Sequence, residues 1–356
     1  MAKFHNLEIK DIYKETEDCS VISFLIPEEL KEEFSFKQGQ YLTLRTTIND
    51  EDIRRSYSLC SSPIDGEWKV AVKKIPEGKF STFVNQTLKK GDTLQVMKPM
   101  GRFGTTISET PKNYIVFVAG SGITPILSML KTHLAMEPQS TFKLFYLNRT
   151  VKSIIFKEEI EQLRNQFFGR LEVFYFLTKE YRDIDLFNGR FTEEKLQTIF
   201  DKLVDVSELD ECFLCGPEDM IFLAKDELIK AGLPKENIHF ELFVTGLSEE
   251  DKKRVEKLAH QKVEGVEVTI VDGGKDFHFT MTKDSHNILD AALAAGADLP
   301  FACKGGVCAT CKCKVVEGEV EMKVNYALEE DEVSKNYVLS CQSVPLTENV
   351  KLDFDV

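Results

Sequence analysis

The sequence predicts a protein of several domains: an antiparallel β-barrel, then a doubly wound α/β domain, then a smaller α+β domain. Three observations support this fold class. Residues 1–105 contain short segments in which apolar and polar residues alternate. From Tyr114 onward, continuously apolar runs alternate with helical stretches. Between Cys303 and Cys311, three cysteines follow the spacing C-x4-C-x2-C. With 356 residues, the chain is too long for one ordinary domain.

The first predicted domain covers residues 1–105. Its candidate strands alternate apolar and polar positions and are separated by turn residues; they include residues 18–26, 40–45, 68–73 and 92–96. Alternation places every second side chain on one face of a strand, so each strand can cover a core with that face. Evenly spaced short strands of this kind indicate an antiparallel barrel or sandwich.

One of these strands carries an arginine, an aromatic residue and a hydroxyl close together in Arg55-Ser56-Tyr57-Ser58. Alternate residues of a strand project from the same face. Arg55 can pair with a phosphate, Tyr57 can cover a flat ring, and the neighbourhood of Ser58 can hydrogen-bond a ring edge. A half-exposed strand without a ligand has a similar composition, so this stretch alone is a weak signal.

A second polar stretch, Gly78-Lys79-Phe80-Ser81-Thr82, opens the apolar run 83–88. We expect Ser81 to be the N-cap of a helix there. The first N–H groups of that helix would suit a pyrophosphate. An ordinary helix cap is the alternative. The two stretches are more specific together, because they lie about 25 residues apart and upstream of a nucleotide motif.

The second domain is predicted for residues 106–245. The apolar run 114–119 reads as a buried parallel strand, and Gly120-Ser121-Gly122-Ile123-Thr124-Pro125 follows it directly. A strand, a glycine turn and a helix form the usual setting of a phosphate-binding loop. Pro125 stands where the third glycine of G-x-G-x-x-G would be. We expect Thr124 and the N–H groups of the turn to face a pyrophosphate.

Further strands and helices alternate along this domain. The expected strands are 142–147, 172–177, 211–215 and 238–243, and the expected helices are 157–166, 193–203 and 220–231. This alternation predicts a doubly wound parallel sheet. The second strand leads into Asn148-Arg149-Thr150, which has no acidic residue to hold a ribose 2′-hydroxyl. Arg149 favours the 2′-phosphate of NADPH over NADH. The alternative is that Arg149 is a surface charge.

The motifs R-x-Y-S, G-x-x-S and Gly-Ser-Gly-Ile-Thr-Pro resemble those of the ferredoxin–NADP reductase superfamily. Residues 39–42 and 100–104 also match landmarks of that superfamily. The resemblance implies that FAD binds to the barrel, with Gly78 and Ser81 in its second motif. It further implies that Arg55 binds the FAD pyrophosphate, that Tyr57 lies against the flavin, and that Ser58 lies near flavin N5.

The same resemblance gives roles to two stretches of the second domain. Cys215-Gly216-Pro217 matches the turn that closes on the cofactor, with Cys215 beside the nicotinamide. Glu241, in the last strand of the domain, matches a polar group near the flavin, and a structural carboxylate is the alternative. The candidate catalytic residues are therefore Ser58, Cys215 and Glu241.

The cysteines Cys303, Cys308 and Cys311 are joined by a distant fourth, Cys341. This is the plant-type spacing of four thiolates around a [2Fe–2S] cluster. Structural zinc is the alternative, but zinc sites usually combine two short C-x2-4-C pairs. Only Cys308 and Cys311 form such a pair here, so the spacing favours iron–sulfur. Gly305 and Gly306 can adopt the left-handed backbone that brings N–H groups close to sulfur.

Residues 299–311 resemble the cluster loop of plant-type ferredoxins, and the likeness extends over residues 263–356. It implies a β-grasp ferredoxin domain. Within it we expect strands at 266–271 and 275–280, a hairpin turn at 272–274 and a helix at 287–296. Residues 246–262 are highly charged and are predicted to be a linker, helical in part.

Charge and hydropathy narrow the possible partners. The formal net charge of −14 argues against nucleic acid, since phosphate backbones are bound by basic surfaces. Residues 263–356 hold 17 acidic and 8 basic residues, so most of the imbalance lies there. That acidic surface could guide the protein toward a basic electron acceptor, or it could serve only to keep the protein soluble. Without an apolar N-terminal segment or a membrane-spanning run, we expect a cytoplasmic protein.

The order of the domains resembles that of phenylacetyl-CoA epoxidase reductases and related multicomponent oxygenase reductases. This resemblance implies that electrons pass from NADPH to FAD, to the [2Fe–2S] cluster and then to an oxygenase, with the phenylacetyl-CoA epoxidase complex as the first choice. Two alternatives stay open. The acceptor could be a desaturase, a hydroxylase or a cytochrome, or the chain could be a redox sensor without turnover.

Overall fold

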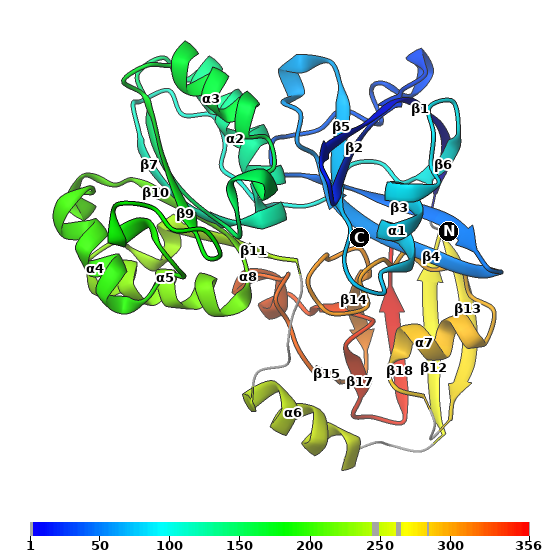
Figure 1. The fold of residues 1–356 in the computed structure, drawn as a ribbon. Helices are drawn as coiled ribbons and strands as arrows, with labels where there is room; N and C mark the ends of the chain where they lie inside the picture. The colour runs from blue at the N-terminus through cyan, green and yellow to red at the C-terminus, as the bar shows by residue number, and fades with distance from the viewer. Residues whose placement is uncertain (1–2, 244–248, 261–264, 283–284, 356) are drawn as a thin grey trace. The chain divides into compact units, whose positions relative to one another are not determined.

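The computed structural model describes residues 3–243, 249–260, 265–282 and 285–355. These residues form two compact units, which are considered separately (Figure 1). The first contains residues 5–53 and 57–243, and the second contains the described part of 244–356 together with residues 3–4 and 54–56. In the described part of the chain, no helix combines the length and apolar character needed to cross a membrane.

The N-terminal half of the first unit is a six-stranded sheet with the order β4-β3-β6-β1-β2-β5. Its strands are β1 (His5–Thr16), β2 (Cys19–Leu25), β3 (Tyr41–Ile48), β4 (Glu51–Ser58), β5 (Trp68–Lys73) and β6 (Thr93–Val96). The pairs β1–β2, β1–β6, β2–β5 and β3–β6 are antiparallel. Alternate residues of β1 such as Leu7 and Ile9 are fully buried, as the period of two requires.

The second half of this unit is a five-stranded parallel sheet with the order β11-β10-β7-β8-β9. Its strands are β7 (Asn113–Ala119), β8 (Thr141–Asn148), β9 (Leu171–Leu177), β10 (Glu211–Gly216) and β11 (Ile238–Leu242). The helices are α2 (Ile123–Met136), α3 (Lys157–Gln166), α4 (Glu193–Lys202) and α5 (Glu218–Lys230). Strand β7 lies in the middle and is buried on both faces, which explains its continuous apolar sequence.

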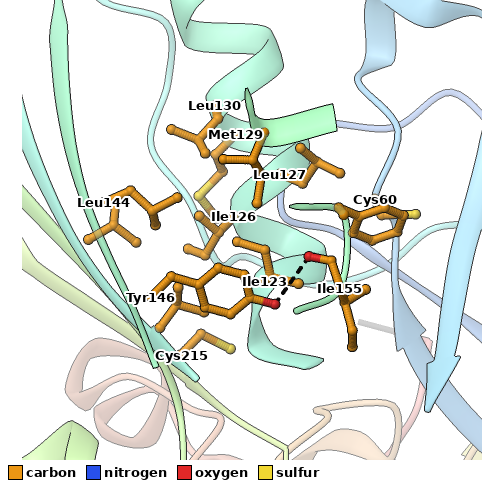
Figure 2. Packing of buried hydrophobic residues seen from close by; sticks show 14 of the residues in the cluster. Cys60, Ile123, Ile126, Leu127, Met129, Leu130, Leu144, Tyr146, Ile155 and Cys215 are labelled. Atoms are coloured by element: carbon orange, nitrogen blue, oxygen red, sulfur yellow. Dashed lines mark hydrogen bonds between the residues drawn. The ribbon is translucent and has the colours of Figure 1, made fainter. Parts of the chain in front are cut away.

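Barrel and parallel sheet share a hydrophobic core. Cys60 and Phe103 of the barrel belong to the same buried cluster as α2 residues such as Ile126 and β8 residues such as Tyr146. Figure 2 shows Ile126 of α2 within this cluster, together with Cys60 and Tyr146. Buried hydrogen bonds cross the same boundary: Ser128 Oγ donates to Ser61 O over 2.6 Å. Close packing and satisfied polar groups therefore hold the two sheets as one unit.

The second unit contains a mixed sheet with the order β13-β12-β18-β14-β16 and a two-stranded sheet, β15–β17. Its strands are β12 (Val266–Asp272), β13 (Lys275–Met281), β14 (Lys312–Glu317), β15 (Val320–Met322), β16 (Tyr337–Leu339), β17 (Ser343–Pro345) and β18 (Asn349–Asp353). Its helices are α6 (Glu249–His260), α7 (Ile288–Ala294) and α8 (Glu330–Ser334). Strands β12 and β18 are parallel, while β12–β13 and β14–β16 are antiparallel.

The predicted hairpin turn between β12 and β13 is confirmed. Gly273 and Gly274 have φ angles of 61° and 69°, the left-handed conformation that a two-residue turn of this kind needs. Asp355 accepts hydrogen bonds from both of their N–H groups, each over 2.7 Å. The turn is therefore fastened to the C-terminal end of the chain.

The expected fold class is confirmed in all three parts, and α3 has the predicted bounds. Of the predicted linker 246–262, residues 246–248 and 261–262 lie outside the described residues, and α6 lies between them. One local prediction is wrong. Helix α1 (Lys79–Gln86) has Gly78 as its N-cap, so Ser81 lies inside the helix and does not cap it.

Candidate functional site

The two polar stretches of the barrel lie together. Tyr57 in β4 and Phe80 in α1 place their ring centroids 5.7 Å apart. Arg55, two residues before Tyr57, is exposed, and its guanidinium donates to the carbonyl of Arg54 over 2.7 Å. Tyr57 thus offers an aromatic surface next to the start of α1.

Gly78 occupies the N-cap because a side chain has no room there. A Cβ at Gly78 would lie 2.4 Å from Ser81 Oγ and 2.4 Å from Ile75 Cγ1. Ser81 is buried and satisfies the turn before the helix: its hydroxyl accepts from Ile75 N over 3.3 Å and donates to Gly78 O over 3.2 Å. Ser81 thus fixes the shape of the helix start from inside the first turn.

The glycine turn after β7 is short. Residues Gly120–Gly122 form one turn of 3₁₀-helix that leads into α2. Gly120 has a φ of 53° and open space on its side-chain face, whereas a Cβ at Gly122 would lie 2.5 Å from Cys215 O. Thr124 is buried and donates its hydroxyl to Ser121 O over 3.0 Å, so it stabilises the turn. Pro125 follows in the first turn of α2, where its missing N–H costs nothing.

Tyr146 supports this turn from the neighbouring strand β8. Its hydroxyl lies 3.0 Å from Gly120 O and 3.2 Å from Ile155 O, both within hydrogen-bond reach. Figure 2 shows the hydrogen bond with Ile155. A phenol buried in a hydrophobic cluster needs such a partner. No sequence pattern points to this role, because Tyr146 resembles any other apolar position of a buried strand.

Three predicted catalytic residues converge. Ser58 Oγ, at the end of β4, donates to Glu241 Oε2 over 3.4 Å. Glu241 in β11 is the register partner of Cys215 in β10, and the two side chains interact electrostatically. Burial raises the pKa of Glu241 to about 8, against the lowering effect of the Ser58 hydrogen bond. Burial also raises the pKa of Cys215 well above that of a free thiol, so this sulfur is a neutral packing group.

The turn after β10 is built by Gly216 and Pro217. Gly216 has a φ of 158°, and a Cβ there would lie 3.1 Å from Ala119 Cβ and 2.7 Å from Met220 Cε. Pro217 is the N-cap of α5. These two residues hold the end of β10 against the end of β7, which is where the nucleotide loop begins.

Arg149 follows β8 at the carboxyl edge of the parallel sheet and is exposed. Its carbonyl accepts a hydrogen bond from Lys179 N over 2.8 Å, so a second cation follows β9 beside it. The carboxylate of Glu180 accepts from Val151 N over 2.9 Å. Ligands of open α/β sheets bind at this edge. Sequence reasoning missed Lys179, because only the parallel register of β8 and β9 places it next to Arg149.

The four predicted cluster ligands lie within the second unit. Cys308, Cys311 and Cys341 are buried, and Cys303 is partly exposed. Cys313 lies in β14 as a buried thiol. Gly305 N donates to Cys303 Sγ over 3.3 Å. A hydrogen bond from the Cys308 thiol and backbone N–H groups lower the pKa of Cys303 to about 5.

The thiols interact in two pairs, Cys303 with Cys308 and Cys311 with Cys341. In the second pair, the Cys311 hydrogen bond lowers the pKa of Cys341. Among the residues that the structure describes, no three His, Cys, Asp or Glu side chains are arranged to hold one metal ion. Four thiols with N–H donors aimed at their sulfurs suit a [2Fe–2S] cluster.

Comparison with known families identifies three domains. Residues 6–104 match a family model described as an oxidoreductase FAD-binding domain, and residues 117–226 match an oxidoreductase NAD-binding domain. Residues 270–346 match a 2Fe-2S iron-sulfur cluster binding domain. The first match covers the strand with Arg55 and Tyr57, the second covers the glycine turn, and the third covers all four cysteines.

Full-length relatives share this organisation. The chain is 43% identical to one of the subunits that make up the 1,2-phenylacetyl-CoA epoxidase of Escherichia coli, over 100% of the chain and 99% of the relative. It is 33% identical to the ferredoxin reductase component of 3-ketosteroid-9-alpha-monooxygenase of Rhodococcus rhodochrous, over 98% and 96%. The solved structure of phthalate dioxygenase reductase has the same fold, with a TM-score of 0.60 and 22% identity over 99% and 98% of the two chains.

Proposed function

The chain belongs to the family of oxygenase reductases that combine FAD-binding, NAD-binding and [2Fe–2S] domains, and we propose that it delivers electrons from NADPH to the oxygenase of a phenylacetyl-CoA epoxidase. The enzyme is an NAD(P)H-dependent oxidoreductase. The choice of acceptor rests on the 43% identity, over the full length, to a component of such an epoxidase.

The proposed FAD site comprises Arg55, Tyr57, Ser58, Gly78 and Ser81. Arg55 would neutralise the pyrophosphate, because its guanidinium is exposed and positively charged. Tyr57 would cover the flavin ring from β4. Gly78 and Ser81 would shape the start of α1, where backbone N–H groups favour an anion.

The proposed nucleotide site follows the carboxyl edge of the parallel sheet. Its residues are Gly120, Gly122, Thr124, Pro125, Arg149, Gly216 and Pro217. The glycine turn would accept the pyrophosphate, since a side chain on Gly122 has no room beside Cys215. Ser58, Cys215 and Glu241 would surround the reacting ring, where Ser58 and Glu241 can supply polar contacts.

Four thiolates, those of Cys303, Cys308, Cys311 and Cys341, would hold the cluster. When bound, FAD would accept the two electrons of a hydride donor, and the cluster would pass them on one at a time. The chain's own task is placement. It keeps Tyr57, Ser58 and the nicotinamide residues in one compact unit and surrounds three of the four ligand sulfurs with protein.

NADPH is the proposed donor because two cations, Arg149 and Lys179, adjoin the same edge. The acidic residue nearest to them in sequence, Glu180, accepts from the backbone of Val151 over 2.9 Å. Its carboxylate is therefore already engaged with the backbone. A 2′-phosphate gains more from two adjacent cations than a hydroxyl does.

Two further proposals concern the chain as a whole. We propose domain limits of 1–105, 106–245 and 263–356, with the linker at 246–262. We also propose a cytoplasmic location, supported by the finding that no helix in the described ranges could cross a membrane. Other oxygenases are the second candidate acceptors, because a 3-ketosteroid monooxygenase component is 33% identical over nearly the whole chain.

The decisive experiment reconstitutes the purified protein with the oxygenase component of a phenylacetyl-CoA epoxidase. NADPH oxidation and epoxide formation are followed together. We expect coupled turnover with that oxygenase, and only slow or uncoupled NADPH oxidation with the oxygenase of a 3-ketosteroid monooxygenase. Coupling only to the steroid enzyme would overturn the proposed acceptor and leave the reductase assignment intact.

A further inference from the structure

The side chain of Gln342 touches the cluster loop at two points. Gln342 follows the fourth cysteine, Cys341, in the turn between β16 and β17, and it is buried. Its Nε2 atom donates to Cys341 Sγ over 3.4 Å and to Lys304 O over 2.9 Å. The second acceptor belongs to the loop between Cys303 and Cys308. One amide group thus joins two segments that are 38 residues apart.

The chemistry of the two acceptors fixes the orientation of the amide. A primary amide carries two N–H donors on nitrogen and only acceptors on oxygen. A carbonyl oxygen can only accept hydrogen bonds, and the same holds for a thiolate sulfur that binds iron. Both hydrogens of Nε2 therefore have a partner, and the reversed orientation would place the oxygen of Gln342 against two acceptors.

The backbone holds the amide in this position. Gln342 N donates to Leu339 O over 2.8 Å, and Gln342 O accepts from Lys323 N over 3.0 Å. The side chain is confined as well, because a Cβ on Gly306 would lie 3.3 Å from Gln342 Cγ. Gly306 has a φ of 79°, so the loop bends there with the conformation that glycine adopts without strain. The donor is therefore fixed before the cluster changes its charge.

We propose that Gln342 is a positioning residue that raises the reduction potential of the [2Fe–2S] cluster through its hydrogen bond to Cys341. This inference rests on the proposed ligand set. Reduction adds one negative charge to the cluster and its four thiolates. A donor aimed at a ligand sulfur stabilises the more negative state more than the oxidised one. Burial strengthens this difference, because little water is present to replace the lost donor.

The test is a redox titration of the full-length protein carrying Gln342→Met. Methionine keeps an unbranched side chain of similar length and removes both donors. We expect reduction of the cluster to become about tenfold less favourable, which is a downward shift of about 59 mV for a one-electron couple. Low-temperature electron paramagnetic resonance measures the amount of reduced cluster, and absorbance measures the amount of reduced flavin. The flavin potential is the internal reference and should not move.

Ser343→Ala is the matched control. Ser343 is the next residue, is fully buried and donates to Leu339 O over 2.9 Å, so its loss removes a buried hydrogen bond without touching a sulfur. Its cluster potential should equal that of the wild type. Resonance Raman spectra should show altered Fe–S stretching only for Gln342→Met. An unchanged potential in Gln342→Met, or an equal drop in Ser343→Ala, would overturn the inference.

A second substitution at the same position, Gln342→Glu, repeats the test. It keeps the shape of the side chain and removes the amide donors. We expect a drop at least as large, since an ionised carboxylate adds repulsion. If both variants lost the cluster while Ser343→Ala kept it, Gln342 would hold the loop and not tune it, which contradicts the proposal. Absence of a cluster spectrum in the wild type would instead refute the ligand set itself.

Discussion

Ser58 and Glu241, which are 183 residues apart in the chain, meet in a hydrogen bond of 3.4 Å between Ser58 Oγ and Glu241 Oε2. One comes from the end of a barrel strand and the other from the last strand of the parallel sheet. Cys215 is the register partner of Glu241. The relationship joins the proposed flavin and nicotinamide residues in one place.

Glu241→Gln should change how stability depends on pH. The pKa of Glu241 is raised by burial from an ordinary 4.5 to about 8. Between these two values the folded protein keeps a proton that the unfolded chain has lost. Its stability therefore falls as the pH rises from about 4.5 to about 8. Glutamine is neutral throughout, so the variant should gain a few degrees in melting temperature over the wild type above pH 8.

The measurement is the melting temperature of both proteins in steps from about pH 5 to about pH 9. Other titrating groups affect both proteins alike, so the difference between them isolates Glu241. A difference that stays constant over the whole range would show that Glu241 is ionised in the folded protein at neutral pH.

Ser58→Ala should slow hydride transfer. The proposed site places Ser58 next to the reacting ring, and the structure fixes its hydroxyl through Glu241. Loss of one well-placed polar group typically costs on the order of 10²-fold in kcat. We expect a drop of that order in NADPH-dependent ferricyanide reduction, with a nearly unchanged KM. Stopped-flow traces of flavin reduction provide the measurement, and a large KM effect with unchanged kcat would assign Ser58 to binding alone.

Arg149→Ala and Lys179→Ala should each weaken the binding of NADPH more than the binding of NADH. Both residues adjoin the carboxyl edge of the sheet, and Lys179 N donates to Arg149 O. A charge-assisted contact with phosphate contributes roughly 1.5–3 kcal/mol, so KM for NADPH should rise about tenfold or more. KM for NADH should change much less. Equal effects on the two nucleotides would refute the proposed 2′-phosphate contact.

Tyr146→Phe should loosen the glycine turn. The phenol has one O–H, which lies within reach of both Gly120 O and Ile155 O, and its loss leaves these two carbonyls with one donor fewer in a hydrophobic setting. We expect a loss of about 1–2 kcal/mol in unfolding free energy and a severalfold higher KM for NADPH. The control is Tyr181→Phe, whose hydroxyl is exposed and bonds Asp185 over 3.2 Å. It should have little effect on stability.

The positions of helices and strands could be predicted from the sequence, because they depend on residues that are close together in the chain. Helix α3 matches its predicted bounds, and the buried strand β7 was visible as an apolar run. The error at Ser81 is also local. Ser81 was predicted to be the N-cap, but the N-cap lies three residues earlier, at Gly78, which leaves room for the Ser81 hydroxyl to close the turn.

Contacts between distant segments could not be predicted in the same way. The approach of Lys179 to Arg149 depends on the register of two parallel strands. The support of Gly120 by Tyr146 depends on a side chain that any buried strand could carry. Neither of these distances is encoded in spacing along the chain.

Cys308→Ser should separate the two halves of the electron path. Cys308 is buried and interacts with Cys303, so serine in its place removes one of four ligand sulfurs. We expect loss of the cluster spectrum and at least a tenfold drop in cytochrome c reduction, while flavin content and NADPH-dependent ferricyanide reduction stay near the wild-type values. Cys313→Ser is the matched control, because Cys313 is also a buried thiol, two residues beyond Cys311 and outside the ligand set. It should keep its cluster. If Cys313→Ser lost the cluster and Cys308→Ser kept it, the proposed ligand set would be wrong, and iron and sulfide analysis of both variants provides the count that decides.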